Sequence, residues 1–282
     1  MGIKKILIIG GTRYIGLDFC KKMSHHKDYQ LHSLSRKKID GNCWRHHECD
    51  RNNIDKFNHV IQEINPHIII DTICFNSIDI ENINCLYNKK KLSNLKHYII
   101  LSSFFIYNHF DYKKFGEKNL EYSRKIESIK DSYTRNKILL EITLSKCQLS
   151  NISSILRLPF VFSSDDYTYR FQTLFNHKYN QSLHSYSFSM VSKSTVVESL
   201  FFLVGTNPSG VIDLANKGYT NFKNLFNLME KISIQSIANF NQSTKDLYKI
   251  ERNICIKTNK IPNVPNLSEE LTKEALNYLG NS

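Results

Sequence analysis

Residues 4–16, KKILIIGGTRYIG, decide the fold of the N-terminal half of the chain. The unbroken apolar run at residues 6–9 is typical of a parallel strand that is buried on both faces. A glycine-rich turn follows it and leads into Leu17 and Phe19, apolar positions of a helix. In such a turn the backbone N–H groups and the helix N-terminus favour the negative charge of a pyrophosphate without any basic side chain. The stretch therefore predicts a nucleotide-binding βα unit.

This turn departs from the G-x-x-G-x-x-G pattern at one position, because Arg13 stands where the middle glycine is usual. The alternative interpretation is a tight turn that binds no ligand. The position of the turn, between a strand and a helix near the N-terminus, favours the ligand.

Composition places the chain among soluble globular proteins. Of its 282 residues, 41% are hydrophobic and 23% are charged. No apolar run approaches the length of about 18 residues that a membrane span needs, so we expect a cytoplasmic protein with no membrane contact. The seven cysteines are scattered and form no C-x-x-C pair, which predicts reduced thiols and no metal site.

The net charge of +12 suits an anionic ligand or a polyanionic partner. The lysines, however, are spread along the whole sequence, and the densest run, residues 89–91, is typical of a solvated helix end. We therefore do not expect a nucleic-acid partner, although an RNA-binding role stays open as an alternative.

Strands and helices alternate up to about residue 160, which predicts an α/β fold with a doubly wound, Rossmann-type parallel sheet. The expected strands are residues 29–34, 67–71, 97–101 and 152–158, and the expected helices are 54–64, 78–87 and 132–146. Ligands of such sheets bind at the carboxyl ends of the strands, where Gly10, Ser35, Asp71 and Ser103 would converge. We expect a nucleotide-binding domain over residues 1–160 and a small substrate-binding lobe over 161–282, partly interleaved with it. Residues 261–265, IPNVP, are typical of a linker.

A Tyr-x-x-x-Lys pair places a phenol and an ammonium one helical turn apart on the same face. The ammonium favours phenolate and lowers the tyrosine pKa from about 10 toward working pH, which makes the phenol a usable acid or base. The pattern occurs at Tyr87/Lys91, Tyr133/Lys137 and Tyr219/Lys223. Only Tyr133 opens a helix that follows a strand ending in a serine, Ser103.

Three motifs together resemble a known family. They are GGTRYIG at residues 10–16, LSSFFIY at 101–107, and YTRNK at 133–137 with Glu141. They are similar to the extended short-chain dehydrogenases/reductases, and more narrowly to the NAD-dependent epimerase/dehydratase group whose glycine turn reads G-G-T-R-[FY]-[IL]-G. The segments RLP at 157–159 and DYTYRF at 166–171 also resemble that group, so the likeness covers roughly residues 3–225.

The resemblance implies a role for each catalytic position. Tyr133 would be the acid or base at the reacting oxygen, and Lys137 would hold the nicotinamide ribose and depress the pKa of Tyr133. Ser103 would hydrogen-bond the reacting oxygen, with Ser102 as the alternative one residue away.

The same resemblance implies two sets of binding residues. The expected cofactor-binding residues are Gly10, Thr12, Arg13, Tyr14, Ile15, Gly16, Ser35, Arg36, Asp50, Arg51, Cys74, Phe75, Lys137 and Pro159. The expected substrate-binding residues are Phe105, Phe160, Asp166 and Arg170. Asp50 could instead be an ordinary loop carboxylate, and Cys74 a plain core residue.

Cofactor choice depends on the end of the second strand. An enzyme that uses NAD usually places a carboxylate there for the ribose hydroxyls, whereas the 2′-phosphate of NADP calls for a cation. Residues 35–38 read SRKK, which favours NADP, with NAD as the second choice.

Two departures from the family pattern narrow the activity. Dehydratases of this family carry an Asp-Glu pair after the serine or threonine, where this chain has Phe104 and Phe105, which argues against dehydration. Residues 191–196, VSKSTV, lack both acidic positions of the segment that the group usually writes V-D-V-R-D, so the resemblance does not carry over the group's C-terminal substrate contacts.

The sequence therefore predicts an NAD(P)-dependent oxidoreductase that acts on a nucleotide-activated sugar, with 4-ketoreductase preferred over epimerase. An RNA-binding or cofactor-sensing protein on the same fold is the alternative from another class. We expect a homodimer. The sequence does not name the sugar or the nucleotide.

Overall fold

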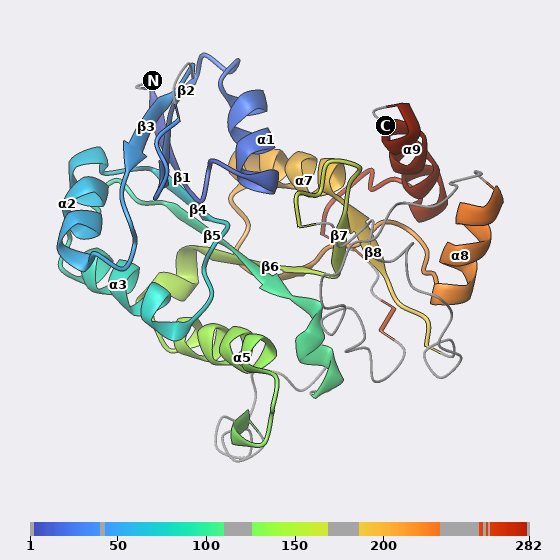
Figure 1. The fold of residues 1–282 in the computed structure, drawn as a ribbon. Coiled ribbons are helices and arrows are strands. Elements are labelled where there is room, and N and C mark those ends of the chain that lie inside the picture. The colour runs from blue at the N-terminus through green and yellow to red at the C-terminus, as the bar shows by residue number, and fades with distance from the viewer. Residues whose placement is uncertain are drawn as a thin grey trace.

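A computed structural model of the chain describes residues 3–39, 43–109, 126–168, 186–231, 254–255, 258 and 260–280. Its centre is a seven-stranded sheet with the order β3-β2-β1-β4-β5-β6-β9 (Figure 1). The strands are β1 Lys4–Ile9, β2 Tyr29–Ser35, β3 Arg45–Glu48, β4 Ile68–Asp71, β5 His97–Ser103, β6 Ser153–Leu158 and β9 Gly210–Asp213. All neighbouring strands pair in parallel, which confirms the predicted α/β, Rossmann-type fold.

Helices cover both faces of the sheet (Figure 1). Helices α1 Tyr14–Met23 and α7 Lys193–Thr206 pack on one face, and α2 Ile54–Ile64, α3 Ser77–Asn88 and α5 Ser132–Ser145 pack on the other. The strand order reverses between β1 and β4, because the chain first builds outward to β3 and then returns to the other side of β1. Ligands of doubly wound sheets bind at such a reversal, outside the carboxyl ends of the strands.

The apolar run of β1 is buried on both faces, as the sequence predicts. Ile6 and Ile8 belong to the core cluster under α1 and α7, whereas Leu7 and Ile9 belong to the cluster under α2, α3 and α5. All four side chains are fully buried. Burial of one such side chain stabilises the fold by about 1.5–3 kcal/mol, so this strand anchors the turn that follows it.

Side-chain caps fix where the helices near the carboxyl edge begin. Asn76 forms a capping box with Asp79 at the start of α3, and Asp131 accepts a hydrogen bond from the backbone N–H of Thr134 at the start of α5. Ser192 caps α7 in the same way. A cap of this kind stabilises a helix by about 1 kcal/mol, and here it fixes the register of the residues just inside each helix.

The part of the chain beyond residue 160 contributes to two units. Strand β9 completes the main sheet, and helix α7 packs on one face of it. Strands β7 Phe160–Phe162 and β8 Met190–Ser192 form a second, two-stranded sheet. Helices α8 Phe222–Lys231 and α9 Leu267–Gly280 lie beside that second sheet (Figure 1). A third core cluster joins residues of β7, β8, α8 and α9 to the short 3-10 helix η1 Phe104–Asn108, and a second such helix, η2 Gln148–Ile152, precedes β6.

The segment expected to be a linker differs from that expectation. Ile261 and Val264 are buried in the core cluster under α1 and α7. Two prolines and an asparagine are typical of a linker, but the two apolar side chains of the segment are buried in this cluster and hold the segment against the rest of the fold. No helix in the described part of the chain is long and apolar enough to cross a membrane.

Candidate cofactor and catalytic site

The glycine turn between β1 and α1 is too tight for side chains at its two ends. Gly10 has φ +89°, and a Cβ there would lie 2.4 Å from the Thr72 hydroxyl. A Cβ on Gly16 would lie 2.4 Å from the carbonyl oxygen of Gly10. The start of α1 therefore packs directly on the backbone of the turn.

The remaining residues of the turn leave the helix N-terminus suited to an anion. Arg13 is exposed and occupies the N-cap position of α1, where its side chain makes no capping hydrogen bond. The first turn of α1 holds no acidic residue. Thr12 is half-buried, Ile15 is buried, and Tyr14 has a left-handed φ of +49°. These features fit a pyrophosphate, which the partial positive charge of a helix N-terminus attracts.

A second, cationic turn follows β2. Ser35 is buried and its hydroxyl donates to the carbonyl of Lys37 at 3.0 Å, while the Arg36 side chain is exposed. His46 on β3 supports this turn, because its Nε2 lies 2.8 Å from the same carbonyl and its Nδ1 lies 2.8 Å from the Ser33 hydroxyl. A carbonyl oxygen only accepts, so Nε2 carries the proton and Nδ1 accepts from Ser33. No sequence pattern pointed to His46, since β3 is short and polar.

Arg51 lies inside a buried ion-pair network. Its guanidinium donates to both carboxylate oxygens of Asp71 at 3.0 Å, to Ile73 O at 2.9 Å, and pairs through Nε with Asp79 at 2.9 Å. Burial lowers the pKa of Arg51, but the charges of Asp71 and Asp79 outweigh it and raise the pKa above its ordinary value. The side chain predicted to bind cofactor thus holds the loop after β4 in place.

Asp50, beside it, is bonded within its own loop. Its carboxylate accepts from the backbone N–H of Asn52 at 2.9 Å, and the residue is half-buried. Asp50 therefore remains a predicted adenine contact that also fits the alternative of an ordinary loop carboxylate.

Lys137 brings three elements of the predicted catalytic site together. Its buried ammonium donates to Cys74 O in the loop after β4 at 2.6 Å and to Leu101 O in β5 at 2.7 Å. The same Nζ lies 5.1 Å from the centre of the Phe75 ring and 5.8 Å from that of Tyr133. A lysine ammonium has three donors, so two carbonyls leave one N–H for a ligand.

The Tyr133 side chain, on the first turn of α5, is 42% exposed. The Cys74 side chain is fully buried instead, and the Cys74 Sγ lies 3.9 Å from the Tyr98 hydroxyl. Burial raises the pKa of the Cys74 thiol, which keeps it protonated. Tyr133 is thus open to a substrate, whereas Cys74 offers its backbone carbonyl and fits the core-residue interpretation.

The two consecutive serines at the end of β5 differ in their partners. The Ser102 hydroxyl donates to the Glu141 carboxylate at 2.5 Å, so its proton is used inside the protein. The Ser103 oxygen accepts a hydrogen bond from Phe105 N at 3.3 Å, which leaves its hydroxyl proton able to donate to a ligand. This difference favours Ser103 over Ser102 as the serine that contacts a reacting oxygen.

Glu141 also anchors a buried polar network behind Ser102. Arg157 donates to the Glu141 carboxylate, at 2.6 Å through Nη2, and to the Tyr107 hydroxyl at 2.6 Å, and Tyr107 donates to Asp213 at 2.6 Å. Burial raises the pKa of Tyr107 and of Asp213 above their ordinary values. The network joins α5, β5, β6 and β9 and fixes the end of β5 that carries the serines.

Aromatic rings lie next to these serines. Phe105 and Phe160 are half-buried and meet edge to face, with ring centres 5.5 Å apart, and Phe104 is fully buried behind them. Pro159 is buried between β6 and β7. Asp166 is also buried, and its carboxylate accepts from the backbone N–H and the hydroxyl of Thr168 at 3.0 and 2.5 Å. Arg170 lies outside the described residues.

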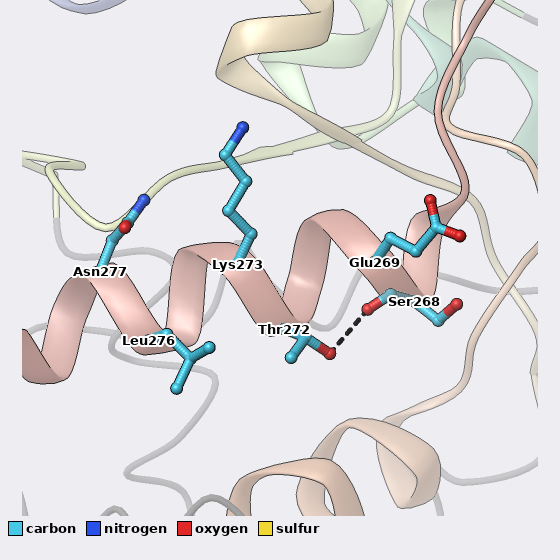
Figure 2. Close-up of a pocket in the computed structure, with 6 residues that line it drawn as sticks. All are labelled: Ser268, Glu269, Thr272, Lys273, Leu276 and Asn277. Atoms are coloured by element: carbon cyan, nitrogen blue, oxygen red, sulfur yellow. Dashed lines mark hydrogen bonds between the residues drawn. The ribbon is translucent and has the colours of Figure 1, made fainter.

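A surface hollow beside α9 is separate from this site (Figure 2). Its lining comes from one helix and is made of Ser268, Glu269, Thr272, Lys273, Leu276 and Asn277. None of these is a predicted site residue, and the Thr272 hydroxyl donates to Ser268 O within the helix at 2.8 Å. Within the described ranges, no cluster of three or more His, Cys, Asp or Glu side chains could hold a metal ion.

The N-terminal part of the chain matches the sequence model of a known protein family. Residues 6–84, which run from β1 through most of α3, match the model described as "NAD dependent epimerase/dehydratase family". The match covers this N-terminal part of the chain. The narrower glycine-turn subgroup stays a prediction, and no curated protein matches the chain in sequence.

Solved structures share the fold over nearly the whole chain. A putative epimerase from Burkholderia cenocepacia J2315 matches with a TM-score of 0.70 and 12% identity over 99% of both chains. The dTDP-4-dehydrorhamnose reductase from Bacillus anthracis, in complex with NADP, matches with 0.68 and 14% over 97% of this chain and 99% of its own. Vestitone reductase from alfalfa matches with 0.68 and 17% over 98% of both. At such identities these likenesses establish the fold.

Proposed function

We propose that the chain is an NAD(P)-dependent oxidoreductase that reduces a keto group of a nucleotide-activated sugar, with NADP(H) as the favoured cofactor. The observation that carries the proposal is the buried Lys137 ammonium, which faces the exposed Tyr133 ring and ties it to the loop after β4 and to β5. The glycine turn after β1 ends at the same carboxyl edge of the sheet. Nucleotide-sugar enzymes among the structural matches, a dTDP-4-dehydrorhamnose reductase and a dTDP-glucose 4,6-dehydratase, support the substrate class by analogy.

The side chains divide the work of a carbonyl reduction. The nicotinamide cofactor, when bound, supplies the hydride. Tyr133 donates the proton to the developing alkoxide, because its phenol is exposed on the first turn of α5. The neighbouring Lys137 ammonium stabilises the phenolate that remains, and its free N–H is available to a ribose hydroxyl. Ser103 donates a hydrogen bond to the same substrate oxygen and polarises the carbonyl.

Two variants of α5 test these roles. Tyr133→Phe removes only the phenolic oxygen of an exposed ring, so it should lower turnover by about 100-fold or more while cofactor affinity stays nearly unchanged. Lys137→Met should lower both turnover and cofactor affinity. Turnover is measured as NADPH oxidation with a panel of nucleotide 4-keto sugars. Tyr133→Phe activity above about a tenth of wild type would overturn the assignment of the proton donor.

The preference for NADP rests on the turn after β2. Ser35, Arg36 and the two lysines that follow present no carboxylate to a ribose, and Arg36 is exposed and available to a 2′-phosphate. Arg36→Glu should weaken NADPH binding by about tenfold or more, the loss of one charge-assisted contact, and leave NADH binding equal or tighter. Lys96→Glu is the matched control. Lys96 is also exposed, but it precedes β5 at the amino ends of the strands, whereas Arg36 follows β2 at the carboxyl ends. Wild-type protein that binds NADH at least as tightly as NADPH would contradict the preference.

Reduction is favoured over dehydration because the residues after Ser103 are aromatic. Phe104 is fully buried and Phe105 packs on Phe160, so this stretch offers no carboxylate to move the protons of a water elimination. Epimerisation remains the alternative activity. The two are separated by the cofactor balance, since a reductase consumes NADPH in proportion to product and an epimerase returns it unchanged.

A further inference from the structure

Lys193, the first residue of α7, carries a buried charge that the proposed chemistry does not use. Its side chain is 9% exposed, and its ammonium lies 2.6 Å from the Asp18 carboxylate and 2.5 Å from the Asp165 carboxylate. A cation at a helix N-terminus faces the positive end of the helix dipole, so the two carboxylates must supply the compensating charge. Asp18 belongs to α1, and Asp165 belongs to the loop after β7.

That loop, residues 163–168, also contacts the glycine turn directly; we call it the coupling loop. The Ser163 hydroxyl donates to the Tyr14 oxygen at 3.3 Å, and the Tyr14 and Tyr167 rings meet edge to face with centres 6.2 Å apart. The Arg13 guanidinium lies 5.6 Å from the Tyr167 ring centre. Two consecutive residues of the predicted cofactor turn therefore touch the loop that carries the predicted substrate residue Asp166.

Lys193 lies between the glycine turn with α1 on one side and the coupling loop on the other. Its Nζ is 5.3 Å from the centre of the Tyr14 ring, and Asp18, one helical turn after Tyr14, takes one of its hydrogen bonds. Burial lowers the pKa of Lys193, but its hydrogen bonds to Asp165 and Asp18 raise it above the ordinary value, so the ammonium stays charged. Without that charge, two carboxylates would face each other across the junction.

The opposite side of the coupling loop is held by α9. Ser164 N donates to the Glu274 carboxylate at 2.7 Å, and Glu274 is buried. The loop is thus held near its start by α9, while Arg13, Tyr14 and Lys193 contact it from the cofactor side.

We propose that Lys193 is a positioning residue that couples the glycine turn to the coupling loop, so that a dinucleotide bound on the turn orders the loop that carries Asp166, the predicted substrate contact. The inference rests on the proposed function, since it needs a cofactor on the turn. It adds to that function a physical link between the cofactor-binding and substrate-binding parts of the chain, formed by one ammonium and two carboxylates.

Hydrogen–deuterium exchange with and without saturating NADPH tests the link, because it follows the turn and the loop separately without substrate. In the wild type, NADPH should slow exchange in residues 10–16 and also in 163–168, each by about fivefold or more, the lower end of ordinary coupling between sites. In Lys193→Met the slowing in 10–16 should persist and that in 163–168 should vanish. Lys193→Arg, which keeps the charge, should restore it.

Lys22→Met is the matched control. Lys22 also bridges α1 and α7, through an exposed ion pair with Glu198, but it lies at the far end of α1 from the turn. It should leave the slowing in 163–168 unchanged. If Lys193→Met unfolds, Asp165→Asn replaces it, since the Asp165 side chain is 64% exposed and the amide removes the negative charge of the same ion pair.

The outcomes separate the two proposals. Slowing in 163–168 that survives Lys193→Met or Asp165→Asn overturns the coupling and leaves the proposed function standing, as does a wild type that responds only in 10–16. If neither NADPH nor NADH slows exchange in 10–16, the proposed function fails and the coupling fails with it.

Discussion

Replacement of Gly16 by alanine should destabilise the protein, although alanine is the better helix former. The new Cβ would lie 2.4 Å from Gly10 O, 3.0 Å from Gly10 C and 3.1 Å from Gly11 Cα. These are backbone atoms of a turn that is itself packed against Thr72 and Ile73, so no side-chain rotation relieves the contact. The turn and α1 must separate by roughly 1 Å to restore ordinary van der Waals distances.

The magnitude follows from two opposing terms. Alanine gains about 1 kcal/mol in helix propensity over glycine, whereas forced overpacking costs about 1–3 kcal/mol. Because the clash is with backbone, we expect the upper end of that cost and a net loss of about 2 kcal/mol. The displaced turn should also weaken NADPH binding by about tenfold or more, since its N–H groups no longer meet the pyrophosphate together.

Gly205→Ala provides the control of opposite sign. Gly205 lies in α7, and a Cβ there would meet no atom within 4 Å. Alanine should therefore stabilise the protein by about 0.5–1 kcal/mol and leave cofactor affinity unchanged. Urea unfolding midpoints and NADPH titration measure both effects. A Gly16→Ala protein as stable as the wild type, or a destabilised Gly205→Ala protein, would refute the steric argument.

Three further predictions concern buried polar groups. Burial lowers the pKa of His32 from 6.5 to about 4. Between pH 6.5 and 4 the unfolded chain binds a proton at His32 that the folded chain does not bind. The free energy of unfolding therefore falls by about 3 kcal/mol as the pH falls from above 6.5 toward 4. His32→Gln should flatten the decline of the urea midpoint between pH 7 and 4.5, and equal declines in both proteins would contradict the assignment. Ser102→Ala, which removes a bond to Glu141, should lower stability by about 1–3 kcal/mol with little effect on turnover, and Ser103→Ala should do the reverse; kinetics and urea unfolding of the pair would show any exchange of roles. Arg51→Met should cost about 3–5 kcal/mol because it strands two buried carboxylates, and a loss below about 1 kcal/mol by urea unfolding would show that the network is not needed.

Periodicity in the sequence predicts much of the sheet and its helices. The helix expected at residues 54–64 has those bounds in the structure, and the strand expected to end at Asp71 ends there, whereas β5 continues to Ser103, two residues past its predicted end at Leu101. Both results arise because burial on one or two faces leaves a regular apolar pattern. Strand β3 escapes this rule, since its four residues, RHHE, are polar and lie at the sheet edge.

Pairings between distant charges are not readable in the same way. The YxxxK motif places Tyr133 and Lys137 on one helical face from spacing alone, and the structure agrees. Nothing in the spacing shows that Arg51 pairs with Asp79, or that Lys193 joins Asp18 to Asp165. Such contacts depend on which loops meet at the carboxyl edge, and this is decided by the whole topology.

The Arg51 network also determines which of two basic residues at the predicted cofactor site, Arg36 or Arg51, can be substituted without disturbing the fold. The Arg51 guanidinium binds Asp71, Asp79 and the Ile73 carbonyl. The carbonyl of the next residue, Cys74, accepts a hydrogen bond from the Lys137 ammonium. A substitution at Arg51 should thus affect Lys137, the predicted catalytic lysine, and the effects of changes at the two positions should not add. Arg36 stands on a separate, exposed turn. Mutational drift, or a designer altering cofactor preference, can therefore vary Arg36 step by step while Arg51 stays fixed.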